Sequence, residues 1–520
     1  DKITPEFTVT SVIMGMLLAV VFGAANAYLG LRVGMTVSAS IPAAVISMGV
    51  IRVIMKKDSI LESNMVQTIG SAGESLAAGA ITLPVLSLWA KDGIMDSPSL
   101  LTIMLISLCG GILGVLFMVP LRNALIVKEH GTLPYPEGTA CAEVLLAGEE
   151  GGASAKSVFA GMGFAALFKF ITDGIKVITA PIKSLKTELS AEVYPALLGV
   201  GYICGPKIAS YMFAGGILGW FVLIPAIVTF GGSTILYPGT ISIADLYATK
   251  GASAIWSNYI KYIGAGAVAT GGIISLIKSL PLIVKTFSDA IKGMKGDKNT
   301  GKLRTEQDID MKAIAIGIVV VTIAIWLIPD IPVTILGAIL IVIFGFFFAT
   351  VSSRMVGIVG SSNNPVSGMA IATLLFATLC LKVTGDVGVH GMKGAIGIGS
   401  VICIIAAMAG DTSQDLKTGY ILGATPKKQQ IGELLGAVIA ALTIGGVLVL
   451  LDSAWGFGTT ELAAPQATLM KTIVEGVMQG NLPWALVFIG VFIALVIEIL
   501  GISVLPVAIG LYLPLELSAT

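Results

Sequence analysis

Carboxyl side chains interrupt several of the most apolar stretches of the sequence. Glu74 lies in "NMVQTIGSAGESLAAGA", Asp411 and Asp415 lie in "MAGDTSQDLKTGY", and Glu498 lies in "ALVFIGVFIALVIEILG". Ionisable groups inside apolar segments are costly, and they usually face a cavity or a partner group. Because such carboxyl groups can carry protons, we interpret them, together with Glu137 of "LPYPEGTACAEVLLAG", as candidate proton carriers.

Three of these carboxyl groups also have a structural interpretation. Glu498 could form a helix–helix hydrogen bond in its protonated form. Glu137 follows Pro136 and could stabilise the N-terminus of a helix. Asp411 could cap a helix that begins near Thr412. The sequence leaves both interpretations open for each of them.

A polar stretch, "GSSNNPVSGM" at 360–369, separates the apolar stretches "RMVGIV" and "AIATLLFATLCL". Asn364 followed by Pro365 is typical of the start of a helix. Free backbone groups and amides at membrane depth are tolerated only where they line a cavity or are buried in protein. We therefore predict a broken helix at which Ser362, Asn363, Asn364 and Pro365 contact a substrate, with an interfacial loop as the alternative.

This stretch has a second copy in the first half of the chain. The segment "VGMTVSASIPA" (33–43) aligns at a constant offset with "VGIVGSSNNPV" (356–366), with identities at Val33/Val356, Gly34/Gly357, Ser38/Ser361 and Pro42/Pro365. Each copy is followed by a glycine-rich polar segment, "GSAGES" or "GDTSQD". Duplicated halves with helices broken at corresponding positions are typical of transporters. We expect a cavity lined by 36–43 and 361–369, with Gln67 at helical spacing from Glu74 as a further substrate contact.

Composition places these residues in a membrane protein. Of the 520 residues, 55% are hydrophobic and 12% are charged, and the mean hydropathy is +0.95. A soluble domain has about 25% charged residues. The apolar stretches predict an all-α integral membrane bundle of about 14–16 transmembrane segments, in two duplicated halves with re-entrant or broken helices.

One long hydrophilic stretch divides the chain. We predict an N-terminal membrane half (1–277), a basic linker (278–312) and a C-terminal membrane half (313–520). The positive-inside rule puts the linker in the cytoplasm, on the same side as the loops 52–58 and 425–430, and the protein in the cytoplasmic (inner) membrane. Both ends of the sequence look trimmed, since it starts without a signal and ends in apolar residues.

Several function classes find no support in the sequence. Lysine plus arginine and aspartate plus glutamate each number 31, and no basic patch favours nucleic acid. Five scattered cysteines and two histidines do not form a metal-binding motif, and no Gly-x-x-x-x-Gly-Lys motif occurs. No nucleophile and base are paired, so an intramembrane enzyme is disfavoured. We expect no metal and no cofactor, with a proton gradient as the energy source.

Several long motifs name a family. These are "NMVQTIGSAGESLAAGAITLP", "LPYPEGTACAEVL", "SSRMVGIVGSSNNPVSGM", "GDTSQDLKTGYILGATPKKQQ" and "GISVLPVAIGLYLPLE". They resemble the oligopeptide transporter (OPT) family, and most closely its prokaryotic members and its yellow-stripe-like metal-chelate branch. The resemblance implies a duplicated secondary transporter with proton-coupled symport into the cytoplasm. The family motifs map onto Glu74, Tyr135, Glu137, Asn363, Asn364, Pro365, Asp411, Gln414 and Asp415.

The expected function combines both lines of argument. We expect a proton-coupled symporter that imports small oligopeptides by alternating access, with Tyr135 and Gln414 among the substrate contacts that the resemblance implies. The alternative is an importer of metal chelates of the siderophore or nicotianamine kind. The expected partners are a small-molecule substrate and the lipid bilayer, and no nucleic acid. The sequence leaves open whether the protein is a homo-oligomer.

Overall fold

Long apolar helices dominate the structure, a computed structural model of the chain. The structure describes residues 5–515 except for the positions 34–35, 37, 58, 151–159, 162, 165, 169, 172–181, 185–186, 190–194, 269, 272, 275–276, 279–280, 282–302, 329–331, 362–363, 365, 460–461, 463, 481–482 and 514. Most of the predicted basic linker therefore lies outside the described residues.

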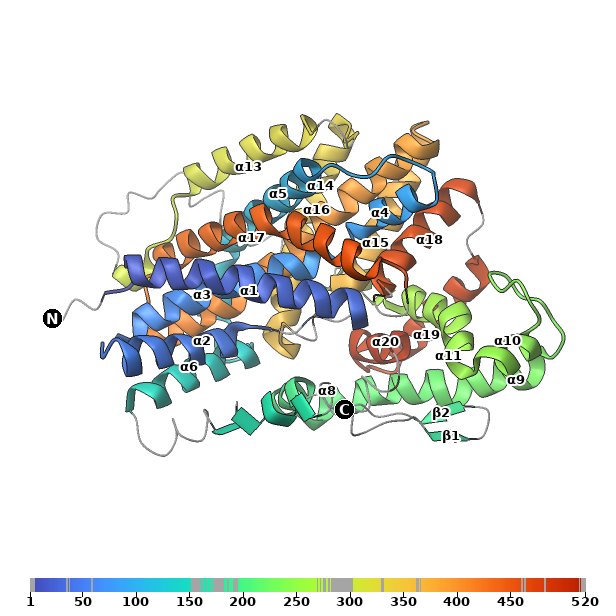
Figure 1. Cartoon of the computed structure of the whole chain (residues 1–520), viewed down its shortest axis with the longest axis horizontal. Coiled ribbons are helices and arrows are strands. Elements are labelled where there is room, and N and C mark those ends of the chain that lie inside the picture. Colours follow the sequence, from blue (N-terminus) through green and yellow to red (C-terminus); the bar gives the residue numbers. More distant parts are fainter. Residues whose placement is uncertain are drawn as a thin grey trace. The chain divides into compact units, whose positions relative to one another are not determined.

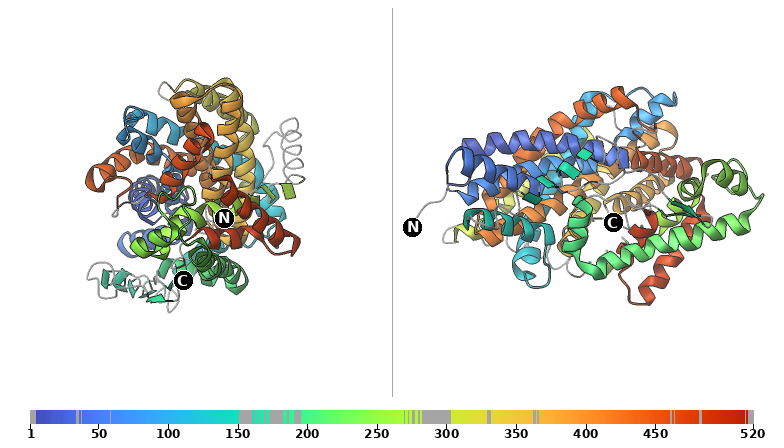
Figure 2. Two further views of the ribbon diagram at one scale, coloured as in Figure 1. Left: turned by 90° about the vertical axis from the view of Figure 1, so that its right-hand side faces the viewer. Right: turned by 60° about the horizontal axis from the view of Figure 1, so that its bottom comes forward.

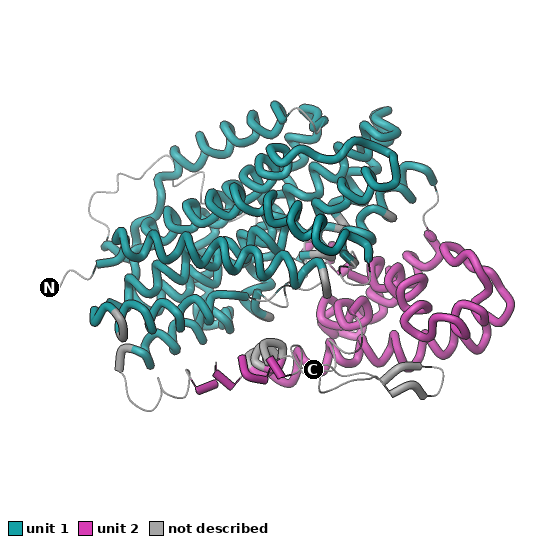
Figure 3. The backbone as a smooth tube through the Cα atoms, in the orientation of Figure 1, with its two compact units in different colours: residues 1–159, 278–480 teal, residues 160–277, 481–520 magenta. Residues whose placement is uncertain are grey.

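The chain divides into two units by its internal contacts. Unit 1 comprises residues 1–159 and 278–480, and unit 2 comprises residues 160–277 and 481–520 (Figure 3). Each unit contains residues from both of the predicted halves, 1–277 and 313–520. The division by contacts is therefore a different one from the division by sequence duplication.

Unit 1 holds most of the long helices (Figure 1). Its elements are α1 (Val9–Val33), α2 (Ser40–Met48), η1 (Gly49–Ile54), α3 (Ile60–Ala80), α4 (Pro84–Lys91), α5 (Leu100–Met118), η2 (Val119–Leu121), η3 (Asn123–Lys128), α6 (Pro136–Glu150), η7 (Arg304–Glu306), α13 (Met311–Trp326), α14 (Ile335–Val359), α15 (Val366–Val383), α16 (Gly388–Leu422), α17 (Pro426–Trp455) and α18 (Pro465–Gln479).

Unit 2 is smaller and also mainly helical. Its elements are the short antiparallel strands β1 (Ile182–Ser184) and β2 (Thr187–Leu189), and the helices α8 (Pro195–Ile217), η5 (Leu218–Leu223), α9 (Ile224–Gly231), α10 (Ile243–Lys250), α11 (Ala252–Ile255), η6 (Trp256–Ile260), α19 (Trp484–Ile499) and α20 (Val504–Tyr512). Within this unit α20 packs against α8.

The predicted class, an all-α polytopic membrane protein, is confirmed. Among the described residues, 8 helices are long and apolar enough to cross a membrane, or up to 9 if a bent pair counts as one span. They are Val9–Leu31, Ile60–Lys91, Leu100–Leu121, Gly205–Gly231, Arg304–Trp326, Ile335–Ile358, Gly388–Leu422 and Pro426–Trp455. In the described part of the chain, several further apolar stretches form shorter or interrupted helices. The stretch 35–54, for example, folds as the short α2 followed by the π-helix η1.

Unit 1 repeats one pattern of helix, break and helix. The first copy is α1, a break and α2, and the second is α14, a break and α15. Helix α1 ends at Val33 and helix α14 ends at Val359, next to the two aligned sequence motifs. The predicted repeat therefore folds into two similar local structures.

The helices of the two copies pack in equivalent ways. Helix α1 packs along α3 and α14 packs along α16, and the first of these pairs runs side by side in Figures 1 and 2. Helix α3 in turn packs against α17, while α16 packs against α5. The long buried helices α3 and α16 thus occupy equivalent places at the centre of unit 1.

Glycines allow this close packing. A Cβ atom on Gly73 of α3 would collide with the backbone of Ala19 in α1, and one on Gly436 of α17 would collide with the Ile69 carbonyl of α3. Small residues at helix crossings let backbones approach and gain van der Waals contact, which drives helix association in lipid. These crossings set the positions of the polar side chains on α3.

The basic loops gather at one end of unit 1. Buried Glu6 pairs with Arg304 and accepts hydrogen bonds from the Thr425 backbone N–H at 3.2 Å and from its hydroxyl at 2.9 Å. The Ser59 hydroxyl donates to the Pro5 carbonyl at 3.2 Å. The segments before α1, before α3, before α13 and before α17 therefore meet at this end, which we call the basic end.

Candidate functional site

Helix α16 carries the polar centre of unit 1. Asp411, Gln414 and Asp415 lie within this helix with 4%, 0% and 0% of their surfaces exposed. Residues three and four apart share one face of a helix. The sequence "GDTSQD" therefore presents two carboxyl groups and an amide together in the interior.

Asp415 links α16 to α3 and to the start of α2. One carboxyl oxygen, Oδ1, accepts from the Ser40 hydroxyl at 3.2 Å and from the amide nitrogen of Gln67. The other, Oδ2, accepts from the Ser71 hydroxyl. Ser40 is the first residue of α2, so Asp415 is bonded to the first helix break.

Asp411 makes the matching link to the second break. Its Oδ1 accepts from the Ser361 hydroxyl at 2.9 Å, and its Oδ2 accepts from the Ser75 hydroxyl of α3. Ser361 lies in the break between α14 and α15. The two aspartates of α16, one helical turn apart, are thus bonded to different copies of the repeated motif.

Two glutamates bind backbone amides at the same breaks. Glu74 of α3 accepts from the Ala39 backbone N–H at 3.1 Å and from the Asn26 side-chain amide of α1 at 3.0 Å. Glu137 of α6 accepts from the Ser361 backbone N–H at 2.7 Å. Each break therefore presents a backbone donor to one buried carboxyl group and a hydroxyl donor to another.

We call Glu74, Glu137, Asp411 and Asp415 the carboxyl cluster. All four were predicted as proton carriers, and the structure brings all four together at the two helix breaks. Among the described residues, Glu74, Asp411 and Asp415 form no ion pair with a lysine, arginine or histidine. Hydroxyl, amide and backbone donors surround them instead.

The two structural alternatives for Asp411 and Glu137 have different outcomes. Asp411 lies deep within α16 and so does not cap a helix that starts near Thr412. Glu137 is in the first turn of α6, where a carboxylate favours the helix N-terminus. Its bond to Ser361 shows that it also holds the second break.

The predicted substrate contacts lie around the cluster. Gln67 donates to Asp415, and Gln414 accepts from the Gly138 backbone N–H at 2.6 Å. The Tyr135 backbone has a φ of 47° and donates to the Gly357 carbonyl at 2.9 Å, so this loop is tied to α14. Gln414 and Tyr135 thus hold α6 and its preceding loop against the second copy of the repeat.

Asn364 is the described member of the predicted asparagine pair. Its amide nitrogen donates to the Ser352 hydroxyl of α14 at 2.6 Å, and its amide oxygen is buried without a hydrogen-bond partner among the described residues. An unpaired amide oxygen can accept a hydrogen bond from a substrate amine or amide. Ser362, Asn363 and Pro365 lie outside the described residues.

Glu498 is the fifth predicted proton carrier. It lies on α19 in unit 2 and is partly exposed. The apolar sequence before it led us to predict a carboxyl group in the same role as the others. The structure places it in the other unit, where neither of its two interpretations is tested.

A buried cation near the cluster was not assigned a role from the sequence. The Lys417 ammonium of α16 is almost fully buried, and it lies 2.8 Å from His130 Nδ1 and donates to the Leu133 carbonyl at 3.2 Å. It thus faces the loop before α6 and not the carboxyl groups. Its direction could have been predicted from "DLKTGY". Lys417 follows Asp415 by two residues and must therefore point to another side of the helix.

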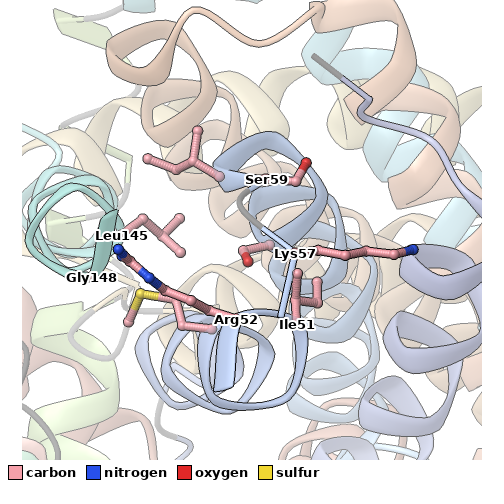
Figure 4. Close-up of a pocket in the computed structure, with 9 residues that line it drawn as sticks. Ile51, Arg52, Lys57, Ser59, Leu145 and Gly148 are labelled. Atoms are coloured by element: carbon pink, nitrogen blue, oxygen red, sulfur yellow. The ribbon is translucent and has the colours of Figure 1, made fainter. Parts of the chain in front are cut away.

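A separate pocket lies at the basic end, between α2, the start of α3 and α6. It is small and partly open to solvent, with a volume of about 20 Å³, and its lining includes Arg52, Ser59, Ser63 and Leu145 (Figure 4). The Arg52 side chain extends toward Leu145, and its Nη1 atom is buried without a partner among the described residues. Among those residues, no group of three or more His, Cys, Asp and Glu side chains is placed to hold a metal ion.

Comparisons with known proteins agree with this architecture. The family model described as "OPT oligopeptide transporter protein" matches residues 6–520. The "Putative oligopeptide transporter" of Haemophilus influenzae is 33% identical, over 94% of this chain and 83% of its own length. "Probable metal-nicotianamine transporter YSL12" of Oryza sativa subsp. japonica is 24% identical, over 69% of this chain and 54% of its own length. "Metal-nicotianamine transporter YSL3" of Arabidopsis thaliana is also 24% identical, over 85% of this chain and 71% of its own length.

Proposed function

The chain belongs to the oligopeptide transporter family, and on that basis we propose that it is a proton-coupled symporter that imports small oligopeptides across the cytoplasmic membrane. It is a multi-pass membrane protein of a transporter family. The proposal adds the energy source, the direction and the substrate. One observation carries the energy source: the carboxyl cluster is bonded to both helix breaks of the duplicated fold.

The argument for protons rests on the surroundings of the cluster. An uncompensated negative charge is costly in an apolar interior, and a proton on the carboxyl group removes that cost. Asp411 and Asp415 are buried and form no ion pair among the described residues. A conformation that exposes them to water would let them release protons, so the fold couples its conformation to proton binding.

The argument for alternating access rests on the two breaks. Asp415 holds Ser40 of the first break and Asp411 holds Ser361 of the second. Loss of a proton from either carboxyl adds a negative charge at its own break. In the proposed cycle, movement of the two copies against each other opens the site to one side of the membrane and then to the other.

The argument for peptides rests on the groups near the second break. The Asn364 amide oxygen, which has no hydrogen-bond partner in the part of the chain that the structure describes, is an acceptor for a peptide N–H or an amine. Peptides present both donors and acceptors along their backbones, and the amides of Asn364 and Gln414 can match either. The relative from Haemophilus influenzae, which carries an oligopeptide transporter name, has the highest identity of those given above.

A second candidate substrate is a metal chelate. Two relatives named as metal-nicotianamine transporters match 69% and 85% of this chain. A chelated metal brings its own ligands, so the protein would need to recognise only the carboxylates and amines of the chelator. The amides that suit a peptide also suit these groups.

Uptake into proteoliposomes distinguishes the candidates. The purified chain is reconstituted, a pH gradient is imposed, and uptake of radiolabelled alanine di-, tri- and tetrapeptides is compared with uptake of ferric chelates. For each proton coupled, one pH unit supports accumulation of about tenfold. We expect accumulation of peptides that stops when a protonophore collapses the gradient. If only the chelates accumulate, the substrate is a metal chelate and not a peptide. If uptake is the same with and without the pH gradient, transport is not coupled to protons.

A further inference from the structure

Glu433 of α17 is a buried carboxyl group that neither the repeat nor the family motifs assign to the site. Its residue surface is 1% exposed, and its side chain lies within hydrogen-bonding reach of the Asp415 carboxyl. Two carboxylates cannot bond to each other, because neither has a donor. A bond between these two groups requires a proton on one of them.

The packing of α17 fixes this contact. Gln429, one turn before Glu433, donates from Nε2 to the Thr68 hydroxyl at 3.2 Å and to the Asp415 carbonyl at 2.9 Å. On the other side, Gly436 lies directly against the Ile69 backbone of α3. The backbone of α17 is therefore fixed on both sides of Glu433.

Unpaired polar atoms continue from this contact along α3. The Asn64 amide oxygen and nitrogen, the Gln67 amide oxygen and one Glu433 carboxyl oxygen are all buried without a partner among the described residues. Asn64 and Gln67 are fully buried and lie three residues apart, on the face of α3 that bears Ser71. Buried water typically satisfies such atoms with two to four hydrogen bonds.

The nearby charges do not neutralise the pair. Asp411 of α16 and Glu74 of α3 face it as further acids. Glu137 of α6 interacts with Asp411 and Glu74. Lys417 is directed to His130, and Lys427 and Lys428 of α17 are exposed. The charge of the pair is therefore set by its own protons.

We propose that Asp415 and Glu433 share one proton, and that a buried water held by Asn64 and Gln67 carries this proton between the pair and the basic end of unit 1. The proposal rests on the proposed function, since it names the route of the coupled proton. In the transfer, the O–H bond on Asp415 breaks as one forms on Glu433. This exchange leaves the single negative charge of the pair unchanged. When the proton leaves the pair, the O–H bond on Glu433 breaks as one forms on the water, and the water gives a proton of its own to solvent at the basic end. The pair then carries two negative charges until a proton returns.

The route agrees with the direction of α3. This helix begins at Ile60, directly after Ser59 of the basic end, and Asn64 lies in its second turn. Gln67, Ser71 and Ser75 follow at successive turns toward Asp415 and Asp411. The side chains of one helix face thus connect the basic end with both aspartates.

The first test separates coupled from uncoupled transport. Glu433→Gln keeps the shape of the side chain and can no longer take up a proton. We expect accumulation of alanine tripeptide driven by the pH gradient to fall to the level without a gradient. Exchange of labelled for unlabelled tripeptide needs no net proton movement and should continue. Glu475→Gln on α18, whose carboxyl group binds the Trp89 indole at 2.8 Å, is the matched control and should accumulate normally.

A second measurement does not depend on any substrate. Infrared spectroscopy resolves the carbonyl stretch of protonated carboxyl groups as the pH is changed. A shared proton predicts that Asp415→Asn and Glu433→Gln alter the same band. If wild-type protein accumulates no peptide, the proposed function fails, and this band alone decides whether the pair shares a proton.

The outcomes are separable. Normal accumulation by Glu433→Gln with an unchanged pH dependence would contradict the shared proton. So would two separate infrared bands, one removed by Asp415→Asn and the other by Glu433→Gln. If Glu433→Gln loses exchange as well, a band altered in common supports the pair and independent bands overturn it. For the water route, Asn64→Leu should slow accumulation without lowering its final level. An unchanged rate would overturn that part.

Discussion

At the scale of single residues, the hydroxyl groups of α2, α3 and the second break complete the carboxyl cluster. Ser40 and Ser71 serve Asp415, and Ser75 and Ser361 serve Asp411. A hydroxyl can donate to a carboxylate and can also accept from a protonated carboxyl group. Such partners remain bonded in both protonation states, which suits a site where protons come and go.

Ser361→Ala tests the link between Asp411 and the second break. The variant removes the 2.9 Å hydroxyl bond and leaves the backbone bond to Glu137. A hydrogen bond to a charged group contributes about 1.5 kcal/mol or more, so we expect the initial rate of gradient-driven uptake to fall about tenfold. The exposed Ser453 of α17, which bonds only its own helix, provides the control variant Ser453→Ala. Equal rates in both variants would show that the hydroxyl plays no part.

Part of this cluster could be predicted from the sequence. Glu74, Asp411 and Asp415 stand out because acids are rare in apolar helices, and Gln67 is one helical turn from Ser71. The partner of each acid could not be predicted, because Ser40 and Asp415 are separated by 375 residues along the chain. Glu433 was visible as an acid in "QQIGELLGAV". Only the packing of α17 on α3 shows that it meets Asp415.

At the scale of elements, close helix crossings hold the site together. Gly73 lets α1 approach α3 at the level of Glu74, next to the Asn26 contact between the same helices. The carboxyl cluster thus depends on backbone distances that only glycine permits.

Gly73→Ala should destabilise the protein. The new methyl group would overlap the Ala19 backbone, and overpacking a tight contact costs about 1–3 kcal/mol. Gly446→Ala in α17 is the matched control, because a Cβ there meets no atom within 4 Å. That variant should be neutral or gain up to about 1 kcal/mol of helix propensity. Thermal unfolding in detergent measures both, and equal midpoints would contradict the close crossing.

The helix breaks were predictable from the sequence, and the length of each apolar helix was not. Proline and polar residues within apolar sequence predicted the breaks after α1 and α14, and the structure has both. Hydropathy alone does not distinguish a spanning helix from a short helix buried by its neighbours. The residues of α2 and η1 are apolar like a span, yet together they form one short helix, and α2 packs on α3 and α6.

At the scale of the whole molecule, the charged loops indicate how unit 1 is oriented. Lys56, Lys57, Arg304, Lys427 and Lys428 lie in the loops or first helical turns of the basic end. Arg304 and Lys428 pair with Glu6, and the Ser59 hydroxyl donates to the neighbouring Pro5 carbonyl, so these segments lie close together. The positive-inside rule assigns that side to the cytoplasm as a prediction.

Cysteine labelling tests this orientation. Lys57→Cys and Lys428→Cys, both at exposed positions, should react with a membrane-impermeant maleimide only in inside-out vesicles. Asp96→Cys, beyond the far end of the span Ile60–Lys91, should react only in right-side-out vesicles. The unsubstituted chain gives the background. Labelling of Lys57→Cys and Asp96→Cys from the same side would contradict the spanning of α3 and α4.

The spacing of the two aspartates on α16 has a geometric consequence. Asp411 and Asp415 are four residues apart, which is about 6 Å along a helix and slightly more than one full turn. If α16 slides by that distance with a small rotation, one carboxyl group arrives near the place that the other has left. Such a slide is a one-turn ratchet, a movement by which packed elements switch position. In the direction that brings Asp411 to the partners of Asp415, Ala407 arrives beside Ser361, so Ser40 keeps a carboxyl partner and Ser361 loses its own.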